Sequence, residues 1–134
     1  MSVEELVRSV YSALAAGDAA ALGELLAPGF EAEVAEGMPL GLGGHRSGSD
    51  AMIRETWWPI GRSFAMRVEP EEWIACEDGR LLVLGRYRGR ARSTGQPVDA
   101  AFAHLWTARD GRLVGLRQLT DTALWAAALE EAAP

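Results

Sequence analysis

Residues 81–120 read LLVLGRYRGR ARSTGQPVDA AFAHLWTARD GRLVGLRQLT, and this stretch decides the fold. It holds three runs in which apolar residues recur on alternate positions: 81–92, 98–108 and 113–120. Ser-Thr-Gly at 93–95 and Asp-Gly at 110–111 separate the runs, and such residues are typical of the tight turns between antiparallel strands. We therefore predict three consecutive strands of an antiparallel sheet.

Two further strands are predicted on the N-terminal side of this stretch. Residues 65–77 form one strand region, which the Asp-Gly pair at 78–79 joins to the first run. The segment 30–36 alternates apolar and acidic residues and predicts a half-buried strand. The glycine-rich residues 37–48 predict a loop.

Helical patterns surround these strands. Apolar residues at helical spacing predict two helices before residue 28 and a third that begins near Ser49 and bends or ends at Pro59. Asp121 is placed to cap a short closing helix. Helices gathered toward one end of an antiparallel sheet define an α+β fold. We expect one domain over residues 1–134, with a curved antiparallel sheet wrapped around the N-terminal helices into a cone whose mouth is apolar.

Composition excludes several classes of protein. The 134 residues are 49% hydrophobic and 24% charged, which is an ordinary globular mixture, and a net charge of −6 argues against a nucleic-acid partner. The single Cys76 and only two histidines argue against a disulfide framework and a metal site, so we expect no metal and no cofactor. No apolar run approaches the roughly 20 residues that span a bilayer. We expect a cytoplasmic protein with no membrane partner.

Five segments carry a resemblance to a known superfamily. They are YSALAAGD at 11–18, LLAPGF at 25–30, GGHRSG at 43–48, AHLWTARDG at 103–111 and RQLTDTAL at 117–124. In this order they resemble the nuclear transport factor 2-like superfamily, and within it the SnoaL-like polyketide cyclases and ketosteroid isomerase relatives. The resemblance implies a cone-shaped fold. The superfamily hosts isomerases, cyclases, dehydratases, epoxide hydrolases and non-catalytic binding domains, so the site has to decide the function.

His104 and Glu36 are the first candidates for proton transfer. His104 lies between Phe102 and Trp106 on one strand face, where an imidazole can donate or accept a proton near neutral pH. Glu36 continues the inward parity of the strand at 30–36, so its carboxylate would be desolvated and its pKa raised. Ketosteroid isomerase relatives place a carboxylate base near this point. The alternatives are a core histidine and a loop-edge glutamate in water.

Asp121 is the third candidate. The tight turn at 110–111 pairs residues whose numbers sum to 221, so His104 would face Arg117 and Asp121 would share the His104 face. A carboxylate there would orient the imidazole, and its place at the end of the last strand matches a SnoaL-like pattern. The alternative role for Asp121 is the helix cap alone.

Five side chains are candidates for substrate binding: Tyr87, Trp57, Trp106, Gln118 and His45. Tyr87 lies on the apolar face of its predicted strand and would point its hydroxyl inward. Gln118 falls on the outer face under the same register, unless a bulge brings it to the His104 side. The tryptophans would serve as packing or as cavity wall, and His45 would rim the mouth or lie exposed in its loop.

The resemblance also concerns a tyrosine. Ketosteroid isomerases carry a tyrosine on the first helix that stabilises an enolate. The best alignment places Val10 at that position and Tyr11 one residue further on. The resemblance therefore predicts that this arrangement is not reproduced.

These observations favour a cofactor-independent isomerase or cyclase that acts on a small apolar carbonyl compound of the polyketide type. His104 with Asp121 would be the acid-base pair and Glu36 a second proton-transfer group. Epoxide hydrolysis is an alternative, because Arg117 near Asp121 fits the cluster of acids and arginine that it needs. A non-catalytic ligand-binding or dimerisation domain is another, favoured by an apolar cavity without convergent carboxylates. We also expect a homodimer that pairs through the uncovered sheet face, with Trp73 and Leu84 in the contact.

Overall fold

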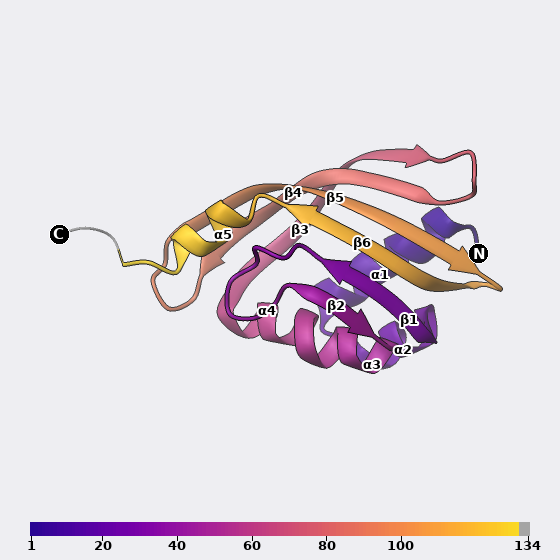
Figure 1. The fold of residues 1–134 in the computed structure, drawn as a ribbon, viewed down its shortest axis with the longest axis horizontal. Coiled ribbons are helices and arrows are strands. Elements are labelled where there is room, and N and C mark those ends of the chain that lie inside the picture. Colours follow the sequence, from indigo (N-terminus) through magenta and orange to yellow (C-terminus); the bar gives the residue numbers. More distant parts are fainter. Residues whose placement is uncertain (132–134) are drawn as a thin grey trace.

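The structure is a computed structural model that describes residues 1–131. Its helical elements are α1 (Val3–Ala16), α2 (Ala19–Leu25), α3 (Ser49–Met52), η1 (Ile53–Trp57), α4 (Trp58–Ser63) and α5 (Thr122–Ala128). Its strands are β1 (Leu26–Val34), β2 (Gly44–Ser47), β3 (Phe64–Ala75), β4 (Leu81–Ala91), β5 (Pro97–Arg109) and β6 (Arg112–Thr120). The sheet curves over α1, while α5 lies at the end of the molecule that carries the C-terminus (Figure 1).

The six strands lie in the order β2-β1-β6-β5-β4-β3. Every neighbouring pair is antiparallel except β1 with β6, which run parallel. The predicted α+β fold with a curved, mostly antiparallel sheet is confirmed. The predicted loop over 37–48 is wrong in part, because residues 44–47 form the short edge strand β2 against β1. Glycine-rich composition concealed this strand.

Helix α1 forms as the sequence predicts. Ser2 and Glu5 make a reciprocal capping box, and Gly17 ends the helix in the left-handed conformation with φ 65°. The helix buries Leu6 and Val10 on the side that packs against β3, β5 and β6. This packing places the concave sheet face opposite one long face of α1.

The predicted third helix continues past Pro59 to the end of α4. A proline has no N–H and disfavours the α-helical turn that precedes it. Here the Trp58 N–H bonds to the Ile53 carbonyl, five residues back, so this turn is π-helical. The helical segment therefore passes the proline and places Thr56 and Trp57 on the wall of the cavity described below.

The closing helix α5 contributes a core residue. Trp125 is fully buried, and its ring meets Phe64 edge-to-face at a centroid distance of 4.9 Å and Tyr87 at 5.1 Å. Leu124, its neighbour, is exposed. The helix thus anchors the end of β6 to the core through one aromatic side chain.

A bulge in β3 changes which side of the sheet Trp73 occupies. The register shifts between Pro70 and Glu72, so Trp73 pairs with the buried Val83 on the concave side. Its ring lies 5.9 Å from that of Tyr11. The prediction that Trp73 lies on the uncovered face is therefore wrong.

A second bulge lies between β5 and β6. Ala108 pairs with Leu113, as the tight turn dictates, but Thr107 pairs with Gly115. This shift of one residue puts His104 opposite Gln118 instead of Arg117. Side chains along β6 exchange faces as a result.

Within residues 1–131 the structure contains no helix with the length and apolar character that a membrane crossing requires.

Candidate ligand site on the concave face of the sheet

A cavity of about 950 Å³ lies between the concave sheet face, α1 and the helical segment from α3 to α4. Its wall is mostly apolar and aromatic, with contributions from Val34, Met52, Trp57, Met66, Trp106 and Leu116. A concave apolar site with few polar groups is typical of small-molecule binding.

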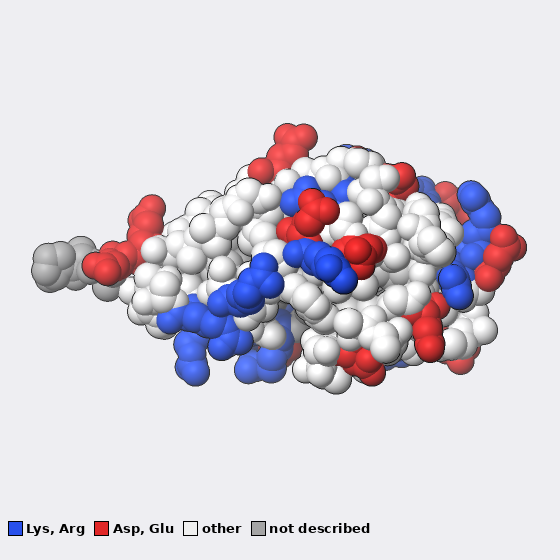
Figure 2. Space-filling model, turned by 90° about the horizontal axis from the view of Figure 1, so that it is seen from below, with Lys and Arg blue, Asp and Glu red and all other residues white. Residues whose placement is uncertain are grey.

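The formally charged residues on the wall are Arg62, Arg67 and Glu69. The Glu69 carboxylate lies 3.2 Å from the Arg88 guanidinium and 3.5 Å from that of Arg67. Seen from below, basic side chains gather toward the end of the molecule that carries the C-terminus (Figure 2). The Glu69 carboxylate of the wall is therefore paired with arginines.

The polar floor of the cavity is a chain of side chains centred on His104. The Tyr11 hydroxyl lies 2.7 Å from His104 Nδ1, and the Tyr87 hydroxyl lies 2.5 Å from His104 Nε2. α1 supplies Tyr11, β4 supplies Tyr87 and β5 supplies His104. The imidazole is thus held between two phenols that reach it from different elements.

Two N–H donors complete the chain at its ends. Gln118 Nε2 donates to the Tyr87 oxygen at 3.0 Å, and Trp106 Nε1 donates to the Tyr11 oxygen at 3.3 Å. The Ala35 amide donates to Gln118 Oε1 at 3.1 Å, which fixes the orientation of that side-chain amide. Every polar atom of the floor therefore has a partner in the protein.

Burial keeps this network uncharged. His104 is 5% exposed, and desolvation lowers its pKa to about 3, so the ring is neutral near pH 7. Desolvation also raises the pKa of Tyr11 and that of Tyr87 well above the usual value for a phenol. The floor of the cavity consists of neutral hydrogen-bonding groups.

The structure brings together most of the predicted binding side chains. Tyr87 points its hydroxyl inward, and the β5–β6 bulge carries Gln118 to the His104 side, as the prediction allowed. Trp57 and Trp106 line the cavity. His104 lies between its aromatic neighbours on the concave face, as predicted.

Glu36 does not point into the cavity. Strand β1 ends at Val34, and the Ala35 amide is taken by Gln118 instead of by another strand. The Met38 amide bonds back to the Ala35 carbonyl, so the chain turns and leaves Glu36 exposed. The prediction that strand alternation continues to Glu36 is wrong for this reason.

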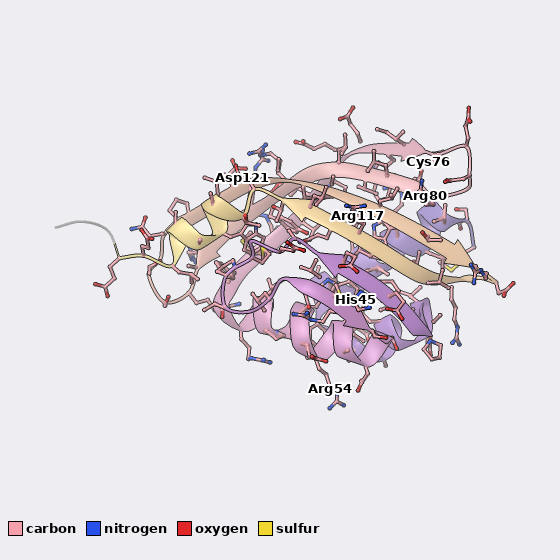
Figure 3. All side chains as sticks on the ribbon, in the orientation of Figure 1. His45, Arg54, Cys76, Arg80, Arg117 and Asp121 are labelled. Atoms are coloured by element: carbon pink, nitrogen blue, oxygen red, sulfur yellow. The ribbon has the colours of Figure 1, made fainter. Side chains whose placement is uncertain are left out.

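Asp121 does not pair with His104. Because of the bulge, Thr120 takes the position opposite Phe102, and Asp121 is exposed beyond the end of β6 (Figure 3). It occupies the N-cap position of α5, without a side-chain hydrogen bond to the helix. The predicted acid-base pair is therefore corrected to a histidine between two tyrosines.

Arg117 lies part-way along β6, exposed on the convex side and separate from Asp121 (Figure 3). Among residues 1–131 it takes part in no ion pair. The pairing of Arg117 with Asp121 on which the epoxide-hydrolysis alternative depended is therefore not formed among the described residues.

His45 lies on β2, away from the mouth of the cavity. Its Nε2 is 2.6 Å from a Glu31 oxygen and its Nδ1 is 2.6 Å from a Glu33 oxygen, on the convex side of the sheet. The prediction that His45 rims the cavity is wrong, because residues 44–47 form a strand whose exposed positions face outward.

Sequence reasoning missed Tyr11 as a site residue. The alignment with ketosteroid isomerases favoured Val10, but the structure buries Val10 in the core and directs Tyr11 to His104. Helical spacing held the signal, because Val7, Tyr11 and Leu14 lie on adjoining turns of one face. The first helix does present a phenol to the cavity, contrary to the expectation.

Comparison with known proteins identifies the family to which this chain belongs. The model of the SnoaL-like domain matches residues 7–116. The chain belongs to the SnoaL-like family. A comparison with curated proteins found no match.

Solved structures similar to this SnoaL-like domain share its fold over nearly the whole chain. A nuclear transport factor 2-like protein of unknown function from Burkholderia pseudomallei K96243 is 31% identical, with a TM-score of 0.83 and 94% and 95% of the two chains covered. TerC, co-crystallised with polyporic acid, is 27% identical, with a TM-score of 0.82 and 92% and 95% covered. A proposed polyketide cyclase from Sinorhizobium meliloti is 26% identical, with a TM-score of 0.67 and 86% and 94% covered.

Proposed function

We propose that this SnoaL-like domain binds a small apolar compound that carries several carbonyl groups and promotes its cyclisation or isomerisation. The observation that carries the proposal is the neutral Tyr11–His104–Tyr87 network on the floor of an apolar cavity. Such a floor offers hydrogen bonds to oxygen atoms, and the wall offers apolar surface to the rest of the ligand. The similarity to TerC and to a proposed polyketide cyclase supports the same ligand class.

The chemistry of such a ligand suits a floor that holds hydrogen-bonding phenols and onto which neither Glu36 nor Asp121 points. A carbon between two carbonyl groups is acidic by itself, so its enol forms without a strong protein base. In ring closure the enol carbon bonds to a second carbonyl carbon, while the enol oxygen loses its proton and the attacked oxygen gains one. The product is an isomer of the substrate, and no oxidant or reductant is consumed.

The protein would accelerate ring closure through its phenols. Negative charge develops on the attacked carbonyl oxygen, and a phenolic O–H in a water-poor cavity is placed to stabilise it. Removing one such donor from an enzyme site costs roughly 10²- to 10³-fold in rate. The aromatic wall would hold the flexible chain in the folded conformation that brings the two carbons together.

Asp121 and Glu36 both lie outside the cavity, and this favours a second candidate function. A cavity without convergent carboxylates fits a domain that binds the same class of ligand without transforming it. Turnover separates the two functions. A synthetic trione such as nonane-2,4,8-trione, in which the carbon between two carbonyl groups can close a six-membered ring on the third, is incubated with the protein, and the loss of substrate and the appearance of the isomeric cyclic aldol are followed by liquid chromatography. Acceleration over buffer supports the cyclase, whereas saturable binding without acceleration supports the binding protein.

We also propose that the domain forms a homodimer through the convex sheet face. Two rows of apolar side chains cross the strands there: Ile74, Leu82 and Leu105 in one, and Leu84, Ala103 and Leu119 in the other. Leu119 is 53% exposed and Ile74 is 42% exposed. A second copy would cover these rows by the self-complementary contact that two-fold symmetry requires.

A further inference from the structure

The floor of the cavity fixes the direction of two hydrogen bonds. The indole N–H of Trp106 is a donor only, and the Gln118 amide is oriented by the Ala35 N–H. Each phenol oxygen therefore accepts one N–H from the protein and has one lone pair and one proton left. This holds for Tyr11 at one end and for Tyr87 at the other.

The histidine between the phenols has one proton to share. A neutral imidazole carries one N–H and one lone pair, and both ring nitrogens of His104 lie within hydrogen-bond distance of a phenol oxygen. The ring must therefore donate to one tyrosine and accept from the other. It has two ways of doing so, one for each tautomer.

Counting protons gives the same result for both tautomers. With the proton on Nδ1, His104 donates to Tyr11 and accepts from Tyr87, so the Tyr11 O–H has no partner in the network. With the proton on Nε2, His104 donates to Tyr87 and accepts from Tyr11, so the Tyr87 O–H has none. In each case the phenol with the free proton has both of its lone pairs occupied.

We propose that His104 is a positioning residue that keeps one, and only one, phenolic proton free, and so makes the floor a receptor for an oxygen that accepts a hydrogen bond. A ketone, quinone or enolate oxygen satisfies that proton. A ligand group that only donates can reach the one lone pair left on the other phenol, but it leaves the free phenolic proton without an acceptor. The free proton comes from α1 in one tautomer and from β4 in the other, so the ligand selects the tautomer that suits the position of its oxygen.

This inference deepens the proposed function, on which it rests for the cavity being a ligand site, but its primary test does not use activity. The chain has only two histidines, and a His45→Gln variant leaves His104 as the only one. Long-range proton–nitrogen NMR spectra at pH 7 then report which nitrogen of His104 carries the proton.

Two phenylalanine variants in this background give opposite expectations. A buried N–H without an acceptor costs more than a lone pair without a donor. Tyr11→Phe should therefore hold the proton on Nε2, facing Tyr87, and Tyr87→Phe should hold it on Nδ1, facing Tyr11. The same tautomer in both variants, or a doubly protonated ring in the parent, overturns the inference. Circular dichroism verifies that each variant is folded.

A binding measurement provides the second readout. The probes are 2-acetonaphthone and 2-ethylnaphthalene, which differ in shape very little but of which only the ketone has an accepting oxygen. We expect the parent and both single variants to prefer the ketone by about tenfold, because one phenol remains to donate in each. The Tyr11→Phe/Tyr87→Phe variant should lose the preference.

The outcomes separate this inference from the proposed function. A single variant that abolishes the ketone preference as completely as the double variant overturns the one-proton account. Opposite tautomers and a ketone preference, in a protein that does not accelerate ring closure, support the receptor and reject the cyclase. Ring closure with one tautomer common to both variants rejects the receptor alone.

Discussion

At the scale of the residue, the site depends on groups that stay neutral. His104 is held by two phenols and by burial, and within residues 1–131 no carboxylate lies against it to favour the imidazolium. The two tyrosines of the network are the only tyrosines in the chain. Bulk measurements of tyrosine therefore report on the site alone.

The tyrosines should resist ionisation. Desolvation raises the pKa of both Tyr11 and Tyr87 above the usual value of about 10, so we expect no tyrosinate absorbance at pH 11 while the protein is folded. Spectrophotometric titration measures this directly. The same titration in denaturant should show ordinary ionisation near pH 10, and equal curves in both conditions would contradict the burial of the network.

His104 should make the fold sensitive to acid. Its pKa is about 3 in the folded state and near 6.5 when unfolded, so the unfolded state binds the extra proton first as the pH falls. Stability should be complete above pH 6.5 and decline toward pH 3. Between pH 6.5 and 4.5 the loss should be on the order of 2 kcal/mol.

Urea unfolding at fixed protein concentration measures this loss. A His104→Gln variant serves as control, because it removes the titrating ring and keeps a polar group at the position. An unchanged slope of stability against pH in that variant would show that other groups cause the acid sensitivity.

At the scale of the element, single-residue shifts in the strands decide which side chains meet. The extra residue in β6 brings Gln118 to the concave face, and the one in β3 turns Trp73 inward. The short strand β2 is held at the sheet edge by β1 and by the contacts of His45 with two glutamates. These contacts need both ring nitrogens of His45 to carry protons.

His45 should titrate in the opposite sense to His104. The hydrogen bond to Glu33 and the charges of Glu33 and Glu31 raise its pKa above 6.5. The support that it gives β2 is therefore present below pH 6.5 and is lost as the pH rises through the raised value. An NMR titration of the ring protons should give a midpoint above 6.5, which Glu33→Gln lowers; a midpoint unaffected by that change would contradict the pairing.

The same elements explain how far the sequence predicts the structure. Strand alternation correctly placed Tyr87, His104 and Trp106 on one face, because parity holds wherever a strand is regular. It failed at Asp121 and Glu36. A bulge reverses which face of the sheet the following side chains occupy, and it has no local sequence signature. Where a strand ends early, the next residue is left exposed to solvent.

At the scale of the whole molecule, the curved sheet has one face toward the cavity and one toward solvent. The convex face carries the two apolar rows, and charged strand positions continue beyond them, such as Arg86 and Arg88 paired with Asp99. An apolar centre with a charged rim is the usual anatomy of a protein interface.

The dimer proposal predicts a change in mass on substitution. Sedimentation at micromolar concentration should give about twice the 14.4 kDa of one chain, and Leu119→Glu should give the monomer with its fold intact. Leu124→Glu on α5 is a matched control, because Leu124 is also exposed but lies outside the two rows. A monomeric parent protein would contradict the proposal.

The most direct test of the account compares turnover of the synthetic trione by variants of the two rival sites. The phenol network predicts that Tyr11→Phe/Tyr87→Phe lowers kcat/KM by roughly 10²-fold or more, because both phenolic donors to the developing oxyanion are removed. Glu36→Gln and Asp121→Ser should stay within about twofold of the parent protein, because both side chains are exposed outside the cavity. A large loss in either carboxylate variant, with turnover retained in the double tyrosine variant, would contradict the account.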